Sequence, residues 1–154
     1  MKNMQETKER ICAFYASDYH FEMMSLPYIN KKIENKEEII ILTENNLEKT
    51  IQTFLSKTNL NEEKKKEILK LNWNNNNEEK IKTIKQKIDK EMTIFIKGQE
   101  NYIQKMNKKI EQLNLEKNQI KIIDCYAMDE IGESMDEVMD QYNKVLRTTG
   151  EKER

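Results

Sequence analysis

Four side chains that could do chemistry follow the first apolar run, ICAFYA. They are Ser17, Asp18, Tyr19 and His20, and His20 is the sole histidine of the sequence. Serine, carboxylate and imidazole are the parts of a nucleophilic triad, but a triad is assembled from separate loops, and neighbours on one turn usually point apart. We therefore expect Ser17 or Asp18 to be the N-cap of a helix, and Tyr15, Tyr19 or His20 to face a ligand cleft.

Further candidates lie after the other predicted strands. Ligands bind beyond the carboxyl ends of the strands in an open parallel sheet. A glycine between strand and helix also lets helix N–H groups face an anion, with a neighbouring lysine supplying charge. The expected ligand-binding residues are Tyr15, Ser17, Asp18, Tyr19, His20, Thr43, Glu44, Lys97, Gly98, Gln99 and Tyr126.

Known phosphate-binding and metal-binding motifs are absent from the sequence. There is no GxGxxG and no GxxxxGK[ST], and without glycine the turn YASDYHF keeps the backbone away from a pyrophosphate. Asp18 stands alone where a receiver domain needs an acidic pair. Asp124, Asp129 and Glu130 could be divalent-metal ligands, but acidic residues here also suit the start of a helix. We expect no catalytic residue, no metal and no cofactor.

Short apolar runs that indicate strands alternate with helical stripes. The predicted strands cover residues 11–16, 38–43, 69–73, 93–96 and 119–126. The run at 69–73 is the weakest, because the short helix before it could continue into it. A continuous β-branched run such as EIIILT indicates a strand covered on both faces. No Asn-Gly or Asp-Gly hairpin signal occurs, which disfavours antiparallel pairs.

Helical stripes and caps fill the intervals. Pro27 lies either in the first turn of a helix capped by Ser25 or inside a longer, kinked helix. Asn46 and Asn61 are expected N-caps. Apolar spacing predicts further helices at 47–55, 62–68, 81–88 and 102–113.

A long last helix is expected after the final strand. Ser134 with Glu137 forms a capping box, and Gly150 suits the position after the helix. Its apolar stripe runs from Met135 to Leu146. An exposed stripe of this kind would support a homodimer. Residues 1–9 and 150–154 are expected to be flexible ends.

The pattern predicts the fold class. The chain has 154 residues, the size of one domain. Helices between strands imply parallel neighbours and right-handed crossovers. We predict a single three-layer, doubly wound α/β domain, Rossmann-like, with a mainly parallel sheet of about five strands.

Composition narrows the class of protein. No apolar run is long enough for a membrane span, and the N-terminus lacks the apolar region of a signal peptide, so we expect a cytoplasmic protein without membrane contact. The net charge of −1, with Lys and Glu interleaved, gives no basic surface for nucleic acid. Cys12 and Cys125 lie in predicted strands and are expected to be free, buried thiols.

The opening of the chain resembles MEDS sensory domains, which are found in regulators of methanogens and methylotrophs. The matching pieces are FYAS at 14–17, LPYI at 26–29, the acidic pair at 37–38 and IIIL at 39–42, within about a quarter of the chain. Arg10 stands where the family usually has histidine, and the glycines usual before the second strand are missing. The resemblance implies a degraded RecA-like α/β module with a sensory or regulatory role and no nucleotide hydrolysis.

These observations lead to an expected function and an alternative. We expect a non-enzymatic sensory or regulatory module that binds a small ligand or a protein partner. The alternative is a nucleotide- or phosphate-binding enzyme with an unrecognised site at the carboxyl ends of the strands.

Overall fold

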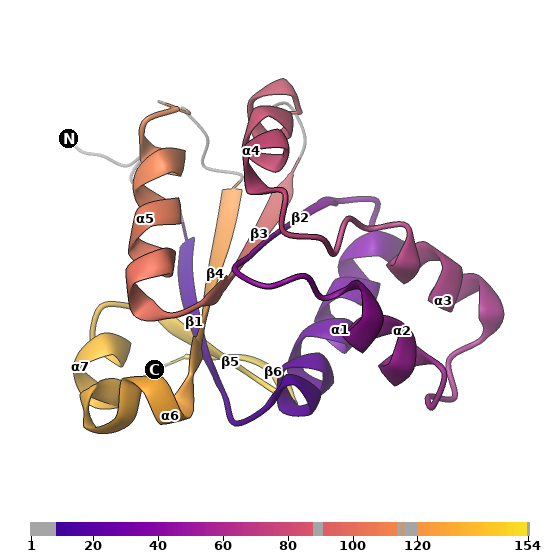
Figure 1. The fold of residues 1–154 in the computed structure, drawn as a ribbon, viewed down its shortest axis with the longest axis horizontal. Coiled ribbons are helices and arrows are strands. Elements are labelled where there is room, and N and C mark those ends of the chain that lie inside the picture. Colours follow the sequence, from indigo (N-terminus) through magenta and orange to yellow (C-terminus); the bar gives the residue numbers. More distant parts are fainter. Residues whose placement is uncertain (1–8, 88–90, 114, 116–119, 154) are drawn as a thin grey trace.

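A six-stranded sheet forms the centre of the described part of the chain, with the strand order β2-β3-β4-β1-β5-β6 (Figure 1). The structure is a computed structural model and describes residues 9–87, 91–113, 115 and 120–153; the predicted positions Ile88 and Gln119, and most of the predicted flexible N-terminus, lie outside them. The strands are β1 (Glu9–Tyr15), β2 (Glu38–Thr43), β3 (Met92–Gly98), β4 (Ile120–Ala127), β5 (Lys144–Arg147) and β6 (Gly150–Glu153). Strands β1 to β5 are parallel, and β6 is antiparallel to β5. The predicted α/β class with a mainly parallel sheet is confirmed.

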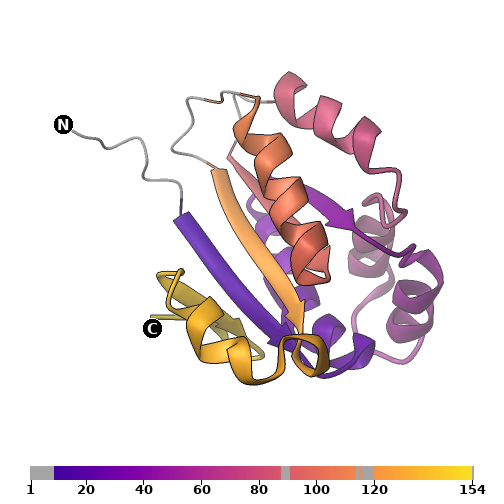
Figure 2. The same ribbon diagram turned by 60° about the vertical axis from the view of Figure 1, so that its left-hand side comes forward.

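Helices cover both faces of this sheet, as Figures 1 and 2 show. One face carries α1 (Asp18–Glu34), α2 (Glu48–Leu55) and α3 (Glu62–Leu69). The other carries α4 (Asn77–Gln86), α5 (Glu100–Glu111), α6 (Met128–Ile131), the 3-10 helix η2 (Gly132–Ser134) and α7 (Met135–Met139). The buried side chains divide in the same way: Ile51 and Ile68 belong to one core, and Ile103 and Val138 to the other. The molecule therefore has the three layers that the alternation of elements predicts.

Continuous β-branched runs place the central strands in the interior. Strand β3 is buried along its whole length, and β2 is buried from Ile39 to Thr43. Strand β1 lies between β4 and β5, so the segment ICAFYA is a central strand, as predicted. Cys12 and Cys125 are buried thiols on the neighbouring strands β1 and β4, but they belong to opposite cores. They therefore face opposite sides of the sheet, where they could not pair with each other.

The start of α1 settles two alternatives left by the sequence. Ser17 is the N-cap, since its Oγ accepts a hydrogen bond from the backbone N–H of His20 at 3.1 Å. From there α1 runs over 17 residues with Pro27 in its interior, so the shorter helix capped by Ser25 is wrong. Asn61 caps α3 as predicted, with its Oδ1 accepting from the first turn at 2.8 Å.

The predicted strand at 69–73 is wrong. The chain leaves α3 as an irregular loop, in which Trp73 is 2% exposed. The Trp73 indole donates to the carbonyl of Ile68 at 2.8 Å, and the backbone N–H of Leu47 donates to the Trp73 carbonyl at 2.8 Å. The ring thus fills the core beneath the helices, its indole N–H bonds to the end of α3, and its backbone carbonyl bonds to the start of α2. Asn46, one residue earlier than the N-cap position of α2, accepts a first-turn N–H at 2.8 Å.

The predicted last helix is also wrong. In its place stand the short α6, η2 and α7, followed by the hairpin β5–β6. Ser134 makes no side-chain capping bond, and Gly150 lies in the hairpin with a φ of 110°. Strand β5 pairs along the edge of β1, and successive side chains of a strand face opposite sides of the sheet, so Val145 and Leu146 are buried in opposite cores. The hairpin removes the helix stripe on which the homodimer prediction depended, and the tail predicted to fray forms β6.

Candidate functional site

The predicted site residues lie at the ends of four strands that are adjacent in the sheet. Strands β2, β3, β4 and β1 are parallel neighbours, so their carboxyl ends form one edge. The structure separates the predicted residues into four groups: those that hold the turns, those at the start of α5, those that surround the buried Lys97, and those that line a cavity.

Three predicted residues stabilise turns. The imidazole Nδ1 of His20 accepts the backbone N–H of Ala16 at 2.8 Å, while Ser17 caps the same turn. Thr43 is fully buried, and its hydroxyl donates to the carbonyl of Asn45 at 2.8 Å. These bonds fix the backbone where β1 and β2 end.

The start of α5 is closed by a carboxylate of the chain itself. Oε1 of Glu44 accepts the backbone N–H of Gln99 at 3.0 Å, where an anion was expected. A Cβ added at Gly98 would lie 2.6 Å from the ring of Tyr102 and 2.8 Å from that carboxylate. Glycine is therefore required here for close packing, and Glu44 occupies the backbone N–H of the N-cap residue Gln99.

Lys97 points to the other face of the sheet and contacts α1. Its Nζ lies 3.2 Å from Oδ1 of Asp18, 4.6 Å from the centre of the Tyr15 ring and 5.2 Å from that of Phe21. The lysine is 5% exposed. Burial raises the pKa of the Tyr15 hydroxyl. A buried ammonium is thus held by one carboxylate and two aromatic rings.

Glu22 is a buried carboxyl beside this lysine. It is 4% exposed, and burial, with a smaller contribution from Asp18, raises its pKa to about 7, although Lys97 acts in the opposite direction. Within the described residues it forms no hydrogen bond and no ion pair. Sequence reasoning missed it, although a signal exists: Glu22 begins the spacing i, i+3, i+4, i+7 with three buried residues, Ser25, Leu26 and Ile29.

A groove between α1 and α2 opens beside Glu22. It has a volume of about 630 Å³, and its lining includes Tyr19, Glu22, Met23, Thr53 and Phe54. The rings of Tyr19 and Phe54 meet edge to face, 5.5 Å apart. A second hollow of about 570 Å³ shares Met23 and Phe54 and extends along α1. We call the two together the α1–α2 groove; of the predicted site residues, Tyr19 lies in it.

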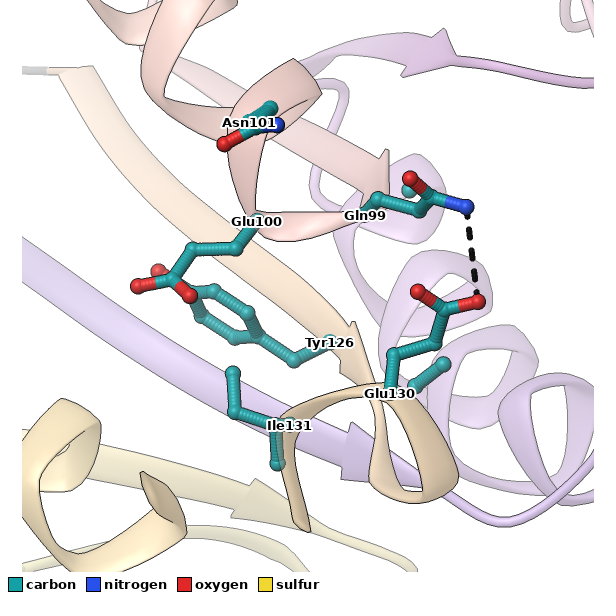
Figure 3. A pocket seen from close by; sticks show the side chains of 8 residues that line it. Gln99, Glu100, Asn101, Tyr126, Glu130 and Ile131 are labelled. Carbon is teal, nitrogen blue, oxygen red and sulfur yellow. Dashed lines mark hydrogen bonds between the residues drawn. The ribbon is translucent and has the colours of Figure 1, made fainter.

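A second, smaller cavity lies where β3 and β4 end (Figure 3). It measures about 190 Å³ and is lined by Tyr126, Gln99 and the carboxylates of Glu100 and Glu130. The Gln99 side chain donates to Glu130 at 3.4 Å. Two carboxylates in so small a space disfavour a phosphate ligand by like-charge repulsion.

Behind Tyr126 lies a buried polar network. Asp124 is fully buried and accepts from Arg10 at 3.0 Å, from the Tyr142 hydroxyl at 2.6 Å and from Asn107 at 3.1 Å. The Tyr142 and Tyr126 hydroxyls are 2.6 Å apart, and burial raises the pKa of Tyr126 to about 12. Asp124 is thus occupied by partners of the chain itself.

The described residues contain neither a metal-binding cluster nor a membrane-spanning helix. Among the described residues, no group of three or more His, Cys, Asp and Glu side chains could hold a metal ion. In the same part of the chain, no helix combines the length and apolar character needed to cross a membrane. Comparisons with protein-family models, curated proteins and solved structures find no match. The resemblance to MEDS domains therefore stays a prediction.

Proposed function

We propose that this chain is a non-enzymatic sensory or regulatory module of the cytoplasm that binds a small organic ligand in the α1–α2 groove. The observation that carries the proposal is the groove itself. The hollow of this groove that Glu22 lines has a volume of about 630 Å³, in the range of small-molecule sites. Such sites combine apolar walls with a few polar groups, as Met23 and Phe54 do here with Glu22.

The position of the groove supports the proposal. Tyr19 and Glu22 lie in the first two turns of α1, directly after the carboxyl end of the central strand β1. Ligands of open α/β sheets bind at this edge. Tyr19 and Met23 are 64% and 41% exposed, so apolar surface remains open to a ligand there. The MEDS resemblance implies a sensory role for the same segment.

The enzyme alternative has less support from the described residues. Ser17 and His20 are engaged in the turn before α1 and do not bond to each other's side chains. The start of α5, a natural phosphate position, is closed by Glu44. A binding module needs neither an activated nucleophile nor a phosphate cradle.

A ligand screen with a groove variant tests the proposal. Thermal unfolding of the protein would be followed with a library of small organic compounds and, separately, with ATP or GTP plus magnesium. We expect organic compounds to raise the melting temperature by several degrees. Met23→Lys should abolish this shift, because it puts a charge on the apolar wall. Leu69→Lys, an equally exposed apolar position on α3, should keep it.

Other outcomes would contradict the proposal. A shift with nucleotide and magnesium, and none with organic compounds, would support the enzyme alternative. Ligand shifts that survive Met23→Lys unchanged would place the ligand outside the α1–α2 groove.

A further inference from the structure

We infer that the α1–α2 groove selects organic cations: the ligand carries an apolar body and a protonated amine, and the amine faces Glu22. This inference rests on the proposed function and names the ligand class for the same site. Three features carry it, namely a buried carboxyl that forms no ion pair, a neighbouring lysine that is paired with another carboxylate, and aromatic rings that line the same groove.

Glu22 supplies the anionic group. Glu22 is 4% exposed yet lines the groove, so the small part of it that solvent still reaches faces the groove. Within the described residues it has neither a hydrogen bond nor an ion pair. Burying a carboxylate without a partner is costly, and a cation that enters the groove would remove that cost.

The neighbouring Lys97 forms its ion pair with Asp18 and not with Glu22. The Nζ of Lys97 is 3.2 Å from Asp18 and lies over the rings of Tyr15 and Phe21, so its charge is already shared with a carboxylate and two aromatic faces. When Glu22 ionises, Lys97 therefore compensates its charge only in part. An ammonium from a ligand can supply the missing partner through a charge-assisted hydrogen bond.

Aromatic rings and the groove rim complete the argument. Tyr19 and Phe54 line the same groove, and aromatic faces attract ammonium groups. Lys49 and Lys57 also line it, but both are exposed, where water and salt screen their charge. The interaction with buried Glu22 is screened far less, so the inner carboxyl decides the preferred charge.

Binding should be coupled to a proton. Near pH 7 part of the Glu22 population is protonated. When a ligand ammonium binds, this carboxyl loses its proton to solvent and becomes the carboxylate partner; the amine keeps its own protons. The other titratable groups around the site are Asp18, Tyr19, Lys97, Lys49, Lys57, Tyr15 and His20.

Three probes of similar shape test the charge preference. Phenethylamine, phenethyl alcohol and phenylacetate share an aromatic body and differ in the head group. Their affinities for the full chain would be measured by NMR chemical-shift titration at about pH 8, where most of Glu22 is ionised. We expect the amine to bind about tenfold more tightly than the alcohol, as a charge-assisted hydrogen bond implies, and phenylacetate to bind most weakly.

Two controls assign the preference to Glu22. Glu22→Gln should lower the affinity for the amine to that for the alcohol and leave the alcohol unchanged. Glu63→Gln removes an exposed carboxylate on α3 and should change neither. For the unmodified chain, amine affinity should fall about tenfold from pH 8 to 6 as Glu22 is protonated, while alcohol affinity stays constant.

The outcomes separate the inference from the proposed function. Equal binding of the three probes, or tighter binding of phenylacetate, would overturn the inference and leave a ligand-binding groove. An amine preference that survives Glu22→Gln would also overturn it. Absence of binding by every probe, together with a negative ligand screen, would count against the proposed function itself.

Discussion

At the scale of single residues, the buried carboxyl of Glu22 links the groove to the stability of the protein. Its pKa of about 7 lies above the ordinary value of 4.5. Between these values the native state binds more protons than the unfolded state, so the free energy of unfolding falls as pH rises. This loss of stability is complete well above pH 7, and it is absent well below the ordinary pKa of 4.5.

Glu22→Gln should remove this penalty. We expect the variant to be more stable than the unmodified chain at about pH 8, by about 1–3 kcal/mol, and to approach it near pH 5. Urea unfolding at both pH values measures the difference. Because the two proteins share every other titratable group, a difference that does not change with pH would show that Glu22 ionises like an exposed glutamate.

Local signals predicted some of these residues and missed others. The cap of α1 depends on a turn of a few residues, so the sequence narrowed it to Ser17 or Asp18, and the structure assigns it to Ser17. Glu44 reaches Gln99 across 55 residues of sequence, and no local pattern could show that it would take the anion position. Glu22 was missed because a glutamate on a helix is usually exposed to solvent. Its burial depends on the packing of α2 beside α1, which no local pattern shows.

At the scale of elements, the end of the chain shows where pattern reasoning failed. The spacing of Met139, Tyr142 and Leu146 suits a helix, but the same residues can be divided between a short helix and a strand. The choice depended on a non-local partner, since the backbone N–H of Asn143 donates to the carbonyl of Arg10 and β5 then pairs with β1. Strands β1 to β4 were predictable because each is a continuous apolar run of its own.

Glu151 attaches the resulting hairpin to the rest of the sheet. Its carboxylate accepts from the Tyr28 hydroxyl of α1 at 2.5 Å, and from Lys121 of β4 at 3.0 Å and Lys144 of β5 at 3.4 Å. Burial alone would raise the pKa of Glu151, but the hydrogen bond from Tyr28 and the two lysines outweigh burial and lower it. Its contribution is therefore present at neutral pH and lost as the carboxylate is protonated in acid.

Glu151→Gln should destabilise the protein by about 1–3 kcal/mol at neutral pH, because charged hydrogen bonds are replaced by weaker ones. The difference should shrink as pH falls below the ordinary glutamate pKa of about 4, because the unfolded chain then binds a proton at this position more readily than the native state does. Glu153→Gln on the same strand is the matched control, since that side chain is 81% exposed and 3.9 Å from Lys144. Equal effects of the two changes in urea unfolding would contradict the role given to Glu151.

At the scale of the whole molecule, one polar network joins elements that are distant in sequence. Asp124 of β4 is bonded to Arg10 of β1, Asn107 of α5 and Tyr142 of the segment before β5. The sheet, α5 and the C-terminal segment thus meet at one fully buried carboxylate. Removing a single partner of a buried ion pair is far more costly than removing both.

Arg10→Met should therefore lower the free energy of unfolding by about 3–5 kcal/mol, since it leaves Asp124 without its cation. Arg10→Met combined with Asp124→Asn should cost less than the sum of the two single changes. A double-mutant cycle by urea unfolding measures this coupling. Additive effects would mean that Arg10 and Asp124 act independently.

The single tryptophan gives the molecule a built-in optical reporter. Trp73 is enclosed by the core of the α1–α3 layer, with its indole N–H bonded to the end of α3 and its carbonyl bonded to the start of α2. Its emission is therefore sensitive to the same helices that form the walls of the groove. Loosening of this layer would expose Trp73 to water and shift its emission to the red. Changes confined to the α4–α7 layer would leave Trp73 buried and its emission wavelength unchanged.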